Sequence, residues 1–252
     1  MKNKKLSSIL FILFLSLIII TPSIQSASDL FTRTDEYNNL RLGNDYVVIV
    51  VNQDENAQGR FAIETTGGAP FREEDQKKPL VYGRPKPWTS YTTVKINENS
   101  YVFGGSTGRR AGRNGDYGEI TQKPNIKNDS IITSTNINGI QIKQILKIVK
   151  SSTTGLYNSV KIEYKIKNNT SKEKNIGLRL MLDTMLGEND GAPFRIKEDA
   201  VDTDKLLLEN ELPNFWQAFD SISSPKVTAQ GTFKGPAVTT PDKVYLSDWG
   251  SM

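Results

Sequence analysis

Hydrophobic and polar positions alternate with a period of two along much of the chain, which is the pattern of half-buried β-strands. The run at 46–51 is continuously apolar, whereas the stretches at 60–66 and 90–96 alternate. Polar, turn-forming residues separate the runs. The pattern predicts β-strands at 46–51, 60–66, 90–96, 101–103, 130–135, 140–149, 157–166, 176–183, 226–233 and 243–247.

The stretches at 140–149 and 157–166 give the clearest strand signal, and a turn at 151–155 joins them into a hairpin. In the first stretch the alternation slips near Ile145, which predicts one β-bulge. The second stretch alternates regularly between apolar and charged residues. The Asn-Gly pair at 138–139 predicts a tight turn before the first strand.

Helical signals are few. Residues 213–221 (PNFWQAFDS) predict one or two helical turns with proline at the start, and residues 206–212 fit either a helix or a strand. Many strands, short turns and little helix predict an all-β protein built as a large antiparallel β-sandwich. No linker-like stretch divides residues 27–252, so they are expected to form a single domain.

Residues 1–26 have the layout of a secretory signal peptide: three lysines, a charge-free apolar run of 15 residues at 6–20, and a break at Pro22. The run is shorter than the roughly 20 residues of a membrane-spanning helix. Cleavage is therefore expected after Ser26 or Ala27. The sequence predicts an exported protein, periplasmic or extracellular, with no membrane span after cleavage.

The amino-acid composition mainly excludes certain kinds of chemistry and of partner. The chain has no cysteine and no histidine, which rules out disulfides, thiolate or imidazole catalysis, and Cys- or His-ligated metals. Loss of the three signal-peptide lysines lowers the net charge from +4 to +1. Because nucleic-acid binding needs concentrated positive charge, no nucleic-acid partner is expected.

Residues 180–194 (LMLDTMLGENDGAPF) leave an apolar strand and enter a glycine-rich acidic turn. Carboxylate and amide oxygens in such a turn are ligands that suit calcium, which makes this turn a candidate calcium site. The spacing differs from that of an EF-hand, and side chains of this kind also cap ordinary turns. The turn is therefore either a calcium site or an ordinary capped turn. The four candidate ligands are Asp183, Glu188, Asn189 and Asp190.

Aromatic and basic side chains provide the other candidate binding residues. Exposed rings stack on sugar faces or anchor a protein partner, whereas buried rings close one end of a sandwich. A stretch of six glycines and three arginines at 104–118 predicts an exposed, mobile loop, whose arginines either hold an anionic partner or are simply hydrated. The candidates are Trp88, Tyr91, Trp216, Arg109, Arg110 and Arg113.

Several stretches are similar to a group of uncharacterised exported bacterial proteins, spirochaete ones among them: RFAIETTGGAP, PLVYGRPKPWTSYTTVKIN, IGLRLMLDTMLGENDGAPF and SPKVTAQGTFKGPAVTTPDKVYLSDW. The resemblance covers most of residues 27–252. It implies a fold akin to the supersandwich of galactose-mutarotase-like domains, a superfamily that often handles carbohydrate. True mutarotases use histidine and glutamate, so the absence of histidine disfavours that activity.

Members of that group carry further strands after the LSDW segment, whereas only three residues follow Trp249 here. The resemblance therefore implies a sandwich lacking its final strands, either completed by a partner or truncated, with an open sheet edge.

Three functions are compatible with these observations. The first is a non-catalytic structural, assembly or binding module of the cell envelope, which the resemblance associates with periplasmic flagella and their sheath. The second is a carbohydrate-binding module. The third is a carboxylate-based carbohydrate-active enzyme, which needs two acids about 5 to 9.5 Å apart. None of the 28 acidic residues is singled out for that chemistry, so we expect no enzymatic activity.

Overall fold

The computed structural model describes residues 29–201 and 203–248. The predicted signal peptide and Trp249 lie outside these residues. The described chain is all-β, as predicted, and contains no α-helix. Its elements are β1 (Phe31–Thr34), β2 (Asn39–Gly43), β3 (Val47–Asn52), β4 (Phe61–Thr65), β5 (Pro79–Val81), β6 (Tyr91–Ile96), β7 (Asn99–Val102), β8 (Asp116–Tyr117), β9 (Glu119–Lys127), β10 (Ser130–Ile137), β11 (Ile140–Val149), β12 (Ser159–Asn168), β13 (Ile176–Met181), β14 (Phe194–Ile196), β15 (Asp199–Val201), β16 (Lys205–Leu208), the 3₁₀ turn η1 (Glu209–Glu211), β17 (Phe215–Phe219), β18 (Thr228–Thr232) and β19 (Lys243–Leu246).

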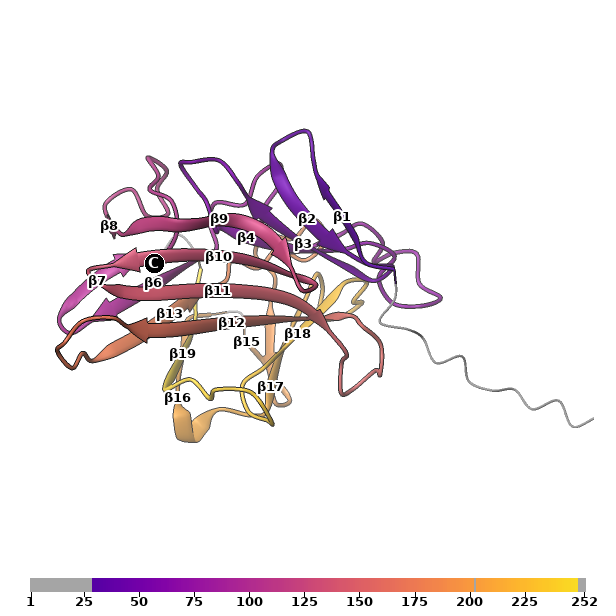
Figure 1. The fold of residues 1–252 in the computed structure, drawn as a ribbon. Coiled ribbons are helices and arrows are strands. Elements are labelled where there is room, and N and C mark those ends of the chain that lie inside the picture. Colours follow the sequence, from indigo (N-terminus) through magenta and orange to yellow (C-terminus); the bar gives the residue numbers. More distant parts are fainter. Residues whose placement is uncertain (1–28, 202, 249–252) are drawn as a thin grey trace, which may run out of the picture.

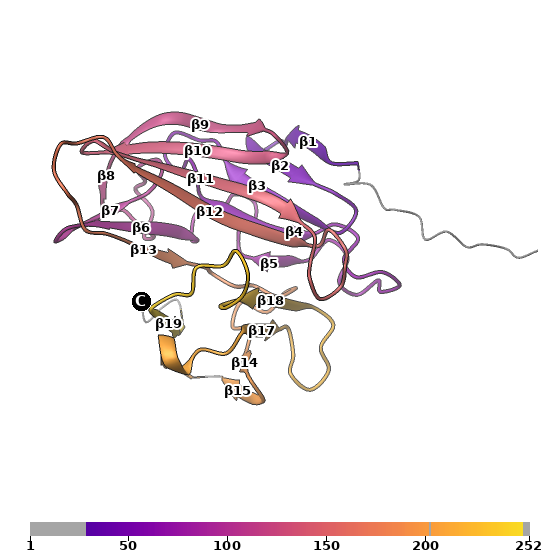
Figure 2. The same cartoon turned by 60° about the horizontal axis from the view of Figure 1, so that its bottom comes forward.

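The strands form four small sheets and one two-stranded ribbon (Figures 1 and 2). Sheet A has the order β1-β2-β3-β4-β5, and sheet B the order β13-β6-β7-β8. Sheet C, with the order β12-β11-β10-β9, contains the longest strands. Sheet D has the order β15-β14-β17-β18, and β16 pairs with β19 in the ribbon. The predicted all-β class is confirmed, but the strands do not form one large two-sheet sandwich.

Two apolar cores lie along one face of sheet C. One joins it to sheet A, where Ile49 and Phe61 pack in the same cluster as Leu146. The other joins it to sheet B, where Val94 packs in the same cluster as Ile142. Sheets A and B thus share a partner without forming one continuous sheet.

The segment between sheets A and B explains why they stay separate. Residues 84–88, which lie between β5 and β6, include Pro85 and Pro87. Proline has no backbone N–H to donate to a strand ladder. The chain therefore leaves sheet A before it enters sheet B. Residues 84–88 form a connecting segment outside both sheets.

The strongest predicted hairpin is present, as the pair β11 and β12, but the predicted bulge near Ile145 is absent. Every residue of β11 pairs in register with β12. The apparent slip arises because Gln144 is buried on the inner face, where it donates to the Tyr164 hydroxyl at 2.7 Å. Ile145 faces outward opposite Ile132. The register shifts of sheet C lie between β9 and β10 instead.

The helical prediction for residues 213–221 is wrong. Residues Phe215–Phe219 form β17, which pairs with β14 on one side and β18 on the other. Trp216 packs across the strand on Phe194, with ring centroids 5.5 Å apart, and lies over Gly231 of β18. This cross-strand packing outweighs the local helical pattern. The ambiguous stretch at 206–212 contains the end of β16 and η1.

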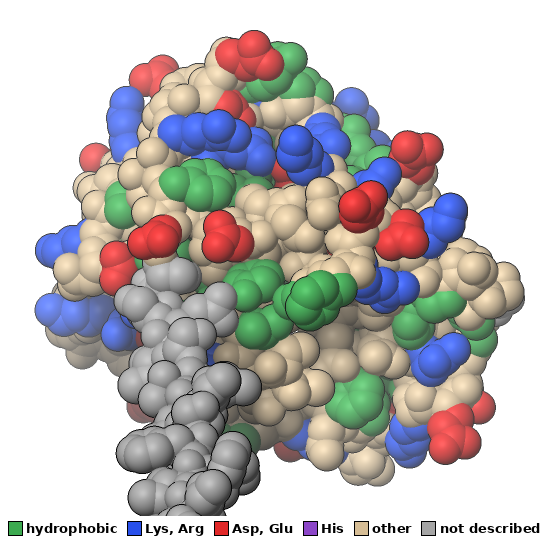
Figure 3. Space-filling model, turned by 90° about the vertical axis from the view of Figure 1, so that its right-hand side faces the viewer, with side chains coloured by type: hydrophobic (Ala, Val, Ile, Leu, Met, Phe, Trp, Pro, Cys, Tyr) green, Lys and Arg blue, Asp and Glu red, His purple; other side chains and the backbone are tan. Residues whose placement is uncertain are grey.

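The described residues include no helix long and apolar enough to cross a membrane. The end of the molecule shown in Figure 3 carries basic and acidic side chains interspersed with small groups of apolar ones. On that face no single sign of charge dominates.

Candidate functional site

A depression of about 380 Å³ brings together two of the predicted binding residues, Trp88 and Arg109. It lies between the loop that follows β3, residues 84–88 and the loop that follows β7. Its polar lining includes Asn52, Asp54 and Lys86. An aromatic ring beside converging polar side chains is the usual composition of a small-molecule site, and this volume is at the small end of the usual range.

Polar side chains of β2 and β3, and that of Arg60 just before β4, hold the backbone of residues 84–88 at successive points. Asn39 donates from Nδ2 to the Pro85 carbonyl oxygen at 2.9 Å, and Asn52 donates from Nδ2 to the Pro87 carbonyl oxygen at 2.9 Å. Arg60 donates from Nε to the Trp88 carbonyl oxygen at 3.1 Å. A short segment with three of its carbonyl groups fixed in this way presents Trp88 in one place.

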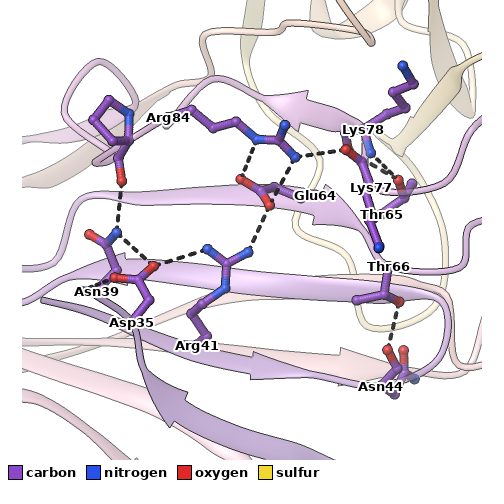
Figure 4. A network of polar contacts seen from close by, with 11 residues as sticks. Asp35, Asn39, Arg41, Asn44, Glu64, Thr65, Thr66, Lys77, Lys78 and Arg84 are labelled. Carbon is purple, nitrogen blue, oxygen red and sulfur yellow. Dashed lines mark hydrogen bonds and ion pairs between the residues drawn. The ribbon is translucent and has the colours of Figure 1, made fainter. Parts of the chain in front are cut away.

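The start of the same segment is fixed by a network of charged side chains (Figure 4). Glu64 of β4 accepts from Arg84 at 3.1 Å and from Arg41 at 2.8 Å. Arg41 also pairs with Asp35 at 3.2 Å. Burial raises the pKa of Asp35, but hydrogen bonds from Asn39, Arg41 and Tyr37 outweigh this effect and the pKa is lowered below its ordinary value.

Arg60 connects the Trp88 segment with the loop that carries Arg109. Its side chain is almost completely buried, with 1% exposed. Besides the Trp88 carbonyl, its guanidinium donates to the Gly105 carbonyl at 3.2 Å and the Ala111 carbonyl at 3.0 Å. It also lies over the ring of Tyr91, 5.7 Å from the centroid. No carboxylate pairs with Arg60 in residues 29–201 and 203–248, so neutral acceptors hold this buried charge.

The prediction that residues 104–118 form an exposed loop holds for its three arginines, whereas part of its backbone is buried. The predicted mobility of this loop stays a prediction. Gly104, Gly105 and Ala111 are buried. Gly104 has φ +100, and a Cβ built on it would lie 2.2 Å from the Gln58 carbonyl oxygen. Gly105 donates from its backbone N–H to the same oxygen at 2.9 Å. The glycines therefore allow this loop to pack closely on the loop after β3.

The three arginines of that loop are exposed at its surface, and one of them lies on the Trp88 ring. The guanidinium carbon of Arg109 is 5.1 Å from the centroid of the Trp88 ring. No acidic side chain of the described chain forms an ion pair with Arg109. Arg110 and Arg113 do not line the depression. The Arg109 guanidinium thus keeps donors available for a ligand while it covers the ring.

Asp54, an acidic residue that lines the same depression, is held in place by two hydrogen-bond donors. It accepts hydrogen bonds from Lys86 Nζ and, at 2.9 Å, from Asn38 Nδ2. The hydrogen bond from Lys86 is the main cause that holds the pKa of Asp54 below its ordinary value, and Asn38 adds to it. At neutral pH Asp54 is an ionised acceptor of hydrogen bonds.

The other predicted aromatic residues do not line the depression. Tyr91 lies against the buried Arg60 guanidinium, and Trp216 packs within sheet D. The structure therefore does not bring the three predicted rings together. Arg60, Asn52, Asp54 and Lys86 are site residues that the sequence did not single out. For Asn52, Asp54 and Arg60 the one signal is a polar side chain close to the end or the start of an apolar strand, whereas Lys86 has no such signal.

The predicted calcium ligands surround a turn held by its own hydrogen bonds. Asn189 accepts from the Gly191 backbone N–H at 2.9 Å and donates to the Asp220 carbonyl at 2.8 Å. Glu188 and Asp190 are exposed, and Asp183 is partly buried. Among the described residues, no group of three or more His, Cys, Asp or Glu side chains is placed to hold a metal ion. The calcium site stays a prediction.

Replacing Asp183 with asparagine should increase stability at neutral pH in the presence of EDTA. Burial raises the pKa of Asp183, and the negative charge of Asp190 adds to the shift. A raised carboxyl pKa means that the native state binds the proton more tightly, so this stabilisation is complete below the unfolded pKa and is lost as pH rises through the folded pKa. Urea unfolding of both proteins at pH 3 and pH 7 should show the gain only at pH 7.

Thermal melting of the same two proteins, with calcium and with EDTA, distinguishes a calcium site from an ordinary capped turn. If Asp183 is a calcium ligand, then added calcium raises the melting temperature of the wild type and leaves that of Asp183→Asn unchanged. Equal melting temperatures of the wild type with calcium and with EDTA would contradict the calcium-site hypothesis.

Comparison with known proteins adds no identification. No protein-family model matches the chain, and no curated protein or solved structure shows a significant match. The resemblance to exported bacterial β-sandwich proteins therefore stays a prediction.

Proposed function

We propose that the protein is a non-catalytic, exported carbohydrate-binding module that holds a sugar in the depression between Trp88 and Arg109. The observation that carries the proposal is an aromatic ring in a fixed segment, beside polar side chains of both charges. Sugars have apolar faces that stack on aromatic rings and hydroxyl groups that both donate and accept hydrogen bonds. Asp54 provides acceptors, and Lys86 provides donors.

The state of the acidic groups favours binding over hydrolysis. Asp54 and Glu55 are the carboxylates that line the depression. A general acid for glycoside cleavage needs a raised pKa, whereas the pKa of Asp54 is lowered by Lys86. Glu55 lies at the surface, where it is 3.6 Å from Lys123. This arrangement supports a site that holds a ligand without cleaving it.

Titration calorimetry with tetrasaccharides of glucose, galactose and N-acetylglucosamine tests the proposal. We expect at least one of these probes to bind the wild type and to bind Trp88→Ala at least about tenfold more weakly, a loss of about 1.4 kcal/mol. Trp88→Phe keeps an aromatic face and should lose less. Trp216→Phe changes a tryptophan outside the depression and should bind as the wild type does. Failure of all three probes to bind the wild type would contradict the proposal.

Arg109 should compete with the sugar for the Trp88 ring. A cation–π contact at an exposed site contributes about 0.5–1 kcal/mol, and a sugar that stacks on the covered face must displace it. Arg109→Ala should therefore bind the neutral tetrasaccharide about two- to fivefold more tightly. Weaker binding in calorimetry would instead show that Arg109 contacts the ligand directly.

A second candidate, assembly in the cell envelope, is favoured by one observation on sheets B and C. Among the described strands, β13 pairs only with β6, and β12 pairs only with β11. Leu178 and Leu180 share the face of the core residue Val94, yet they are 42% and 37% exposed. Ile166, on the inner face of β12, is also 37% exposed. Sheet edges with an uncovered apolar face favour strand addition by another chain.

Sedimentation velocity over a wide range of protein concentration tests this candidate in its simplest form, self-association. The wild type should associate at high concentration, and Leu178→Asp combined with Leu180→Asp should prevent this. Phe215→Asp, at an exposed residue of sheet D, is the matched control. A wild type that stays monomeric throughout would count against self-assembly.

A further inference from the structure

The outer face of sheet C, away from the depression and from both cores, carries a row of lysines along two neighbouring strands. Figure 1 shows these strands, β11 and β12, running side by side along the molecule. The inner face of β11 is apolar except for Gln144. Directly paired residues of neighbouring strands lie on the same face of a sheet. The outward residues of β11 and β12 include the five members of what we call the lysine stripe: Lys143, Lys147, Lys161, Lys165 and Lys167.

The charge of the lysine stripe is nearly uncompensated. Glu163 is the one acidic side chain among the outward residues of β11 and β12, where it pairs with Lys161 at 2.9 Å and Lys165 at 3.4 Å. Five lysines and one glutamate give the stripe a net charge of +4, whereas residues 27–252 as a whole carry +1. The rest of residues 27–252 therefore carries a net charge of −3, so the stripe is positive on an otherwise acidic chain.

The register places like charges directly opposite one another. Lys143 pairs with Lys165, and Lys147 pairs with Lys161. Directly opposed like charges destabilise a sheet, whereas opposite charges at such positions stabilise it. Glu163 pairs with one lysine of each pair and offsets part of this repulsion, and a bound polyanion would offset more of it.

The shape of the lysine stripe indicates what kind of polyanion it fits. Lys161 and Lys167 are six positions apart in β12, a length of about 20 Å at about 3.4 Å per residue. The stripe is only two strands wide, at about 4.8 Å per strand. The outward residues of β10, next to it, carry no charge: Ser130, Ile132, Ser134 and Asn136. A long, narrow site matches one extended polymer chain better than it matches a flat bilayer surface.

We propose that the lysine stripe binds an extended acidic polysaccharide. This site is separate from the depression beside Trp88 and uses different chemistry, since lysines bind carboxylate or sulfate groups as point charges. Its binding should fall steeply with salt, because each neutralised anionic group releases a counterion.

Fluorescence anisotropy with labelled polygalacturonate fragments tests the proposal on the full chain. Lys143→Gln combined with Lys165→Gln should weaken binding at least tenfold and lower the slope of log Kd against log salt concentration by about two. The matched control removes the same charge elsewhere, as Lys226→Gln combined with Lys243→Gln, and should change Kd less than about twofold. The urea midpoint of each variant checks that it folds.

Three results would overturn this proposal. One is equal weakening by the two double variants, which would show diffuse attraction to the whole protein. A second is no measurable binding of polygalacturonate at low salt. The third is tighter binding, through the same lysines, to vesicles rich in phosphatidylglycerol or to single-stranded DNA of equal charge. Trp88→Ala should leave polygalacturonate binding unchanged, so failure here and failure of the sugar site are distinguishable.

Discussion

Replacing Arg60 with methionine should lower the free energy of unfolding by about 3 kcal/mol or more, and it should weaken sugar binding although Arg60 does not touch the sugar. The substitution keeps a long apolar stem but leaves the buried carbonyl groups of Trp88, Gly105 and Ala111 without their donors. Each buried acceptor left without a partner costs about 1–3 kcal/mol. Urea unfolding and calorimetry measure the two effects.

Two further arginine variants separate the role of Arg60 from that of a positive charge alone. Arg60→Lys keeps the charge but lacks the planar fork that reaches four acceptors, the three carbonyl oxygens and the Tyr117 hydroxyl, so it should be nearly as destabilising. Arg84→Met removes an arginine that is 51% exposed and should cost much less. An Arg60→Met protein with wild-type stability would contradict the account of how the loop and the Trp88 segment are held together.

The second large effect is expected for Glu64→Gln. The Glu64 carboxylate is 7% exposed and faces two arginines, so the variant leaves the largely buried Arg41 facing an amide in place of a full negative charge. Removing one partner of a buried ion pair costs about 3–5 kcal/mol. We expect the lower end, about 3 kcal/mol, because Arg84 is half exposed and water can replace part of its contact.

An exposed ion pair provides the matched control for this variant. Glu98 pairs with Lys95 at 3.5 Å, with 93% of the glutamate side chain exposed. Glu98→Gln makes the same chemical change and should leave the urea midpoint unaltered. If Glu64→Gln proved as mild as Glu98→Gln, the network in Figure 4 would not be what fixes the start of the Trp88 segment.

Much of the strand content could be predicted from the sequence because the inner faces of the strands are apolar. The β11 and β12 hairpin shows this most clearly, since Ile140, Ile142 and Leu146 are fully buried on one face. The tight turn at 138–139 followed from its Asn-Gly pair, and both residues have positive φ. The alternation pattern gave a wrong prediction at Gln144. Its buried amide interrupts the apolar series, and this interruption resembles the slip that a β-bulge produces.

The arrangement of the sheets and most of the site could not be predicted, because both depend on contacts between distant parts of the chain. The sequence singled out Trp88 and Arg109 separately, but only the fold places the guanidinium over the ring. Arg60 looked like an ordinary residue at the start of a predicted strand, and its function depends on acceptors 28 to 57 residues away. Residues 213–221 show the converse case, in which cross-strand packing of Trp216 overrides a local helical pattern.

Fluorine NMR of protein labelled with 5-fluorotryptophan tests the central claim most directly. The chain has three tryptophans, at 88, 216 and 249, so three resonances can be assigned by single substitutions. Titration with the tetrasaccharide that binds in calorimetry should shift the Trp88 resonance and leave that of Trp216 in place. A bound sugar that moves the Trp216 resonance while Trp88 stays unchanged would show that the ligand lies elsewhere.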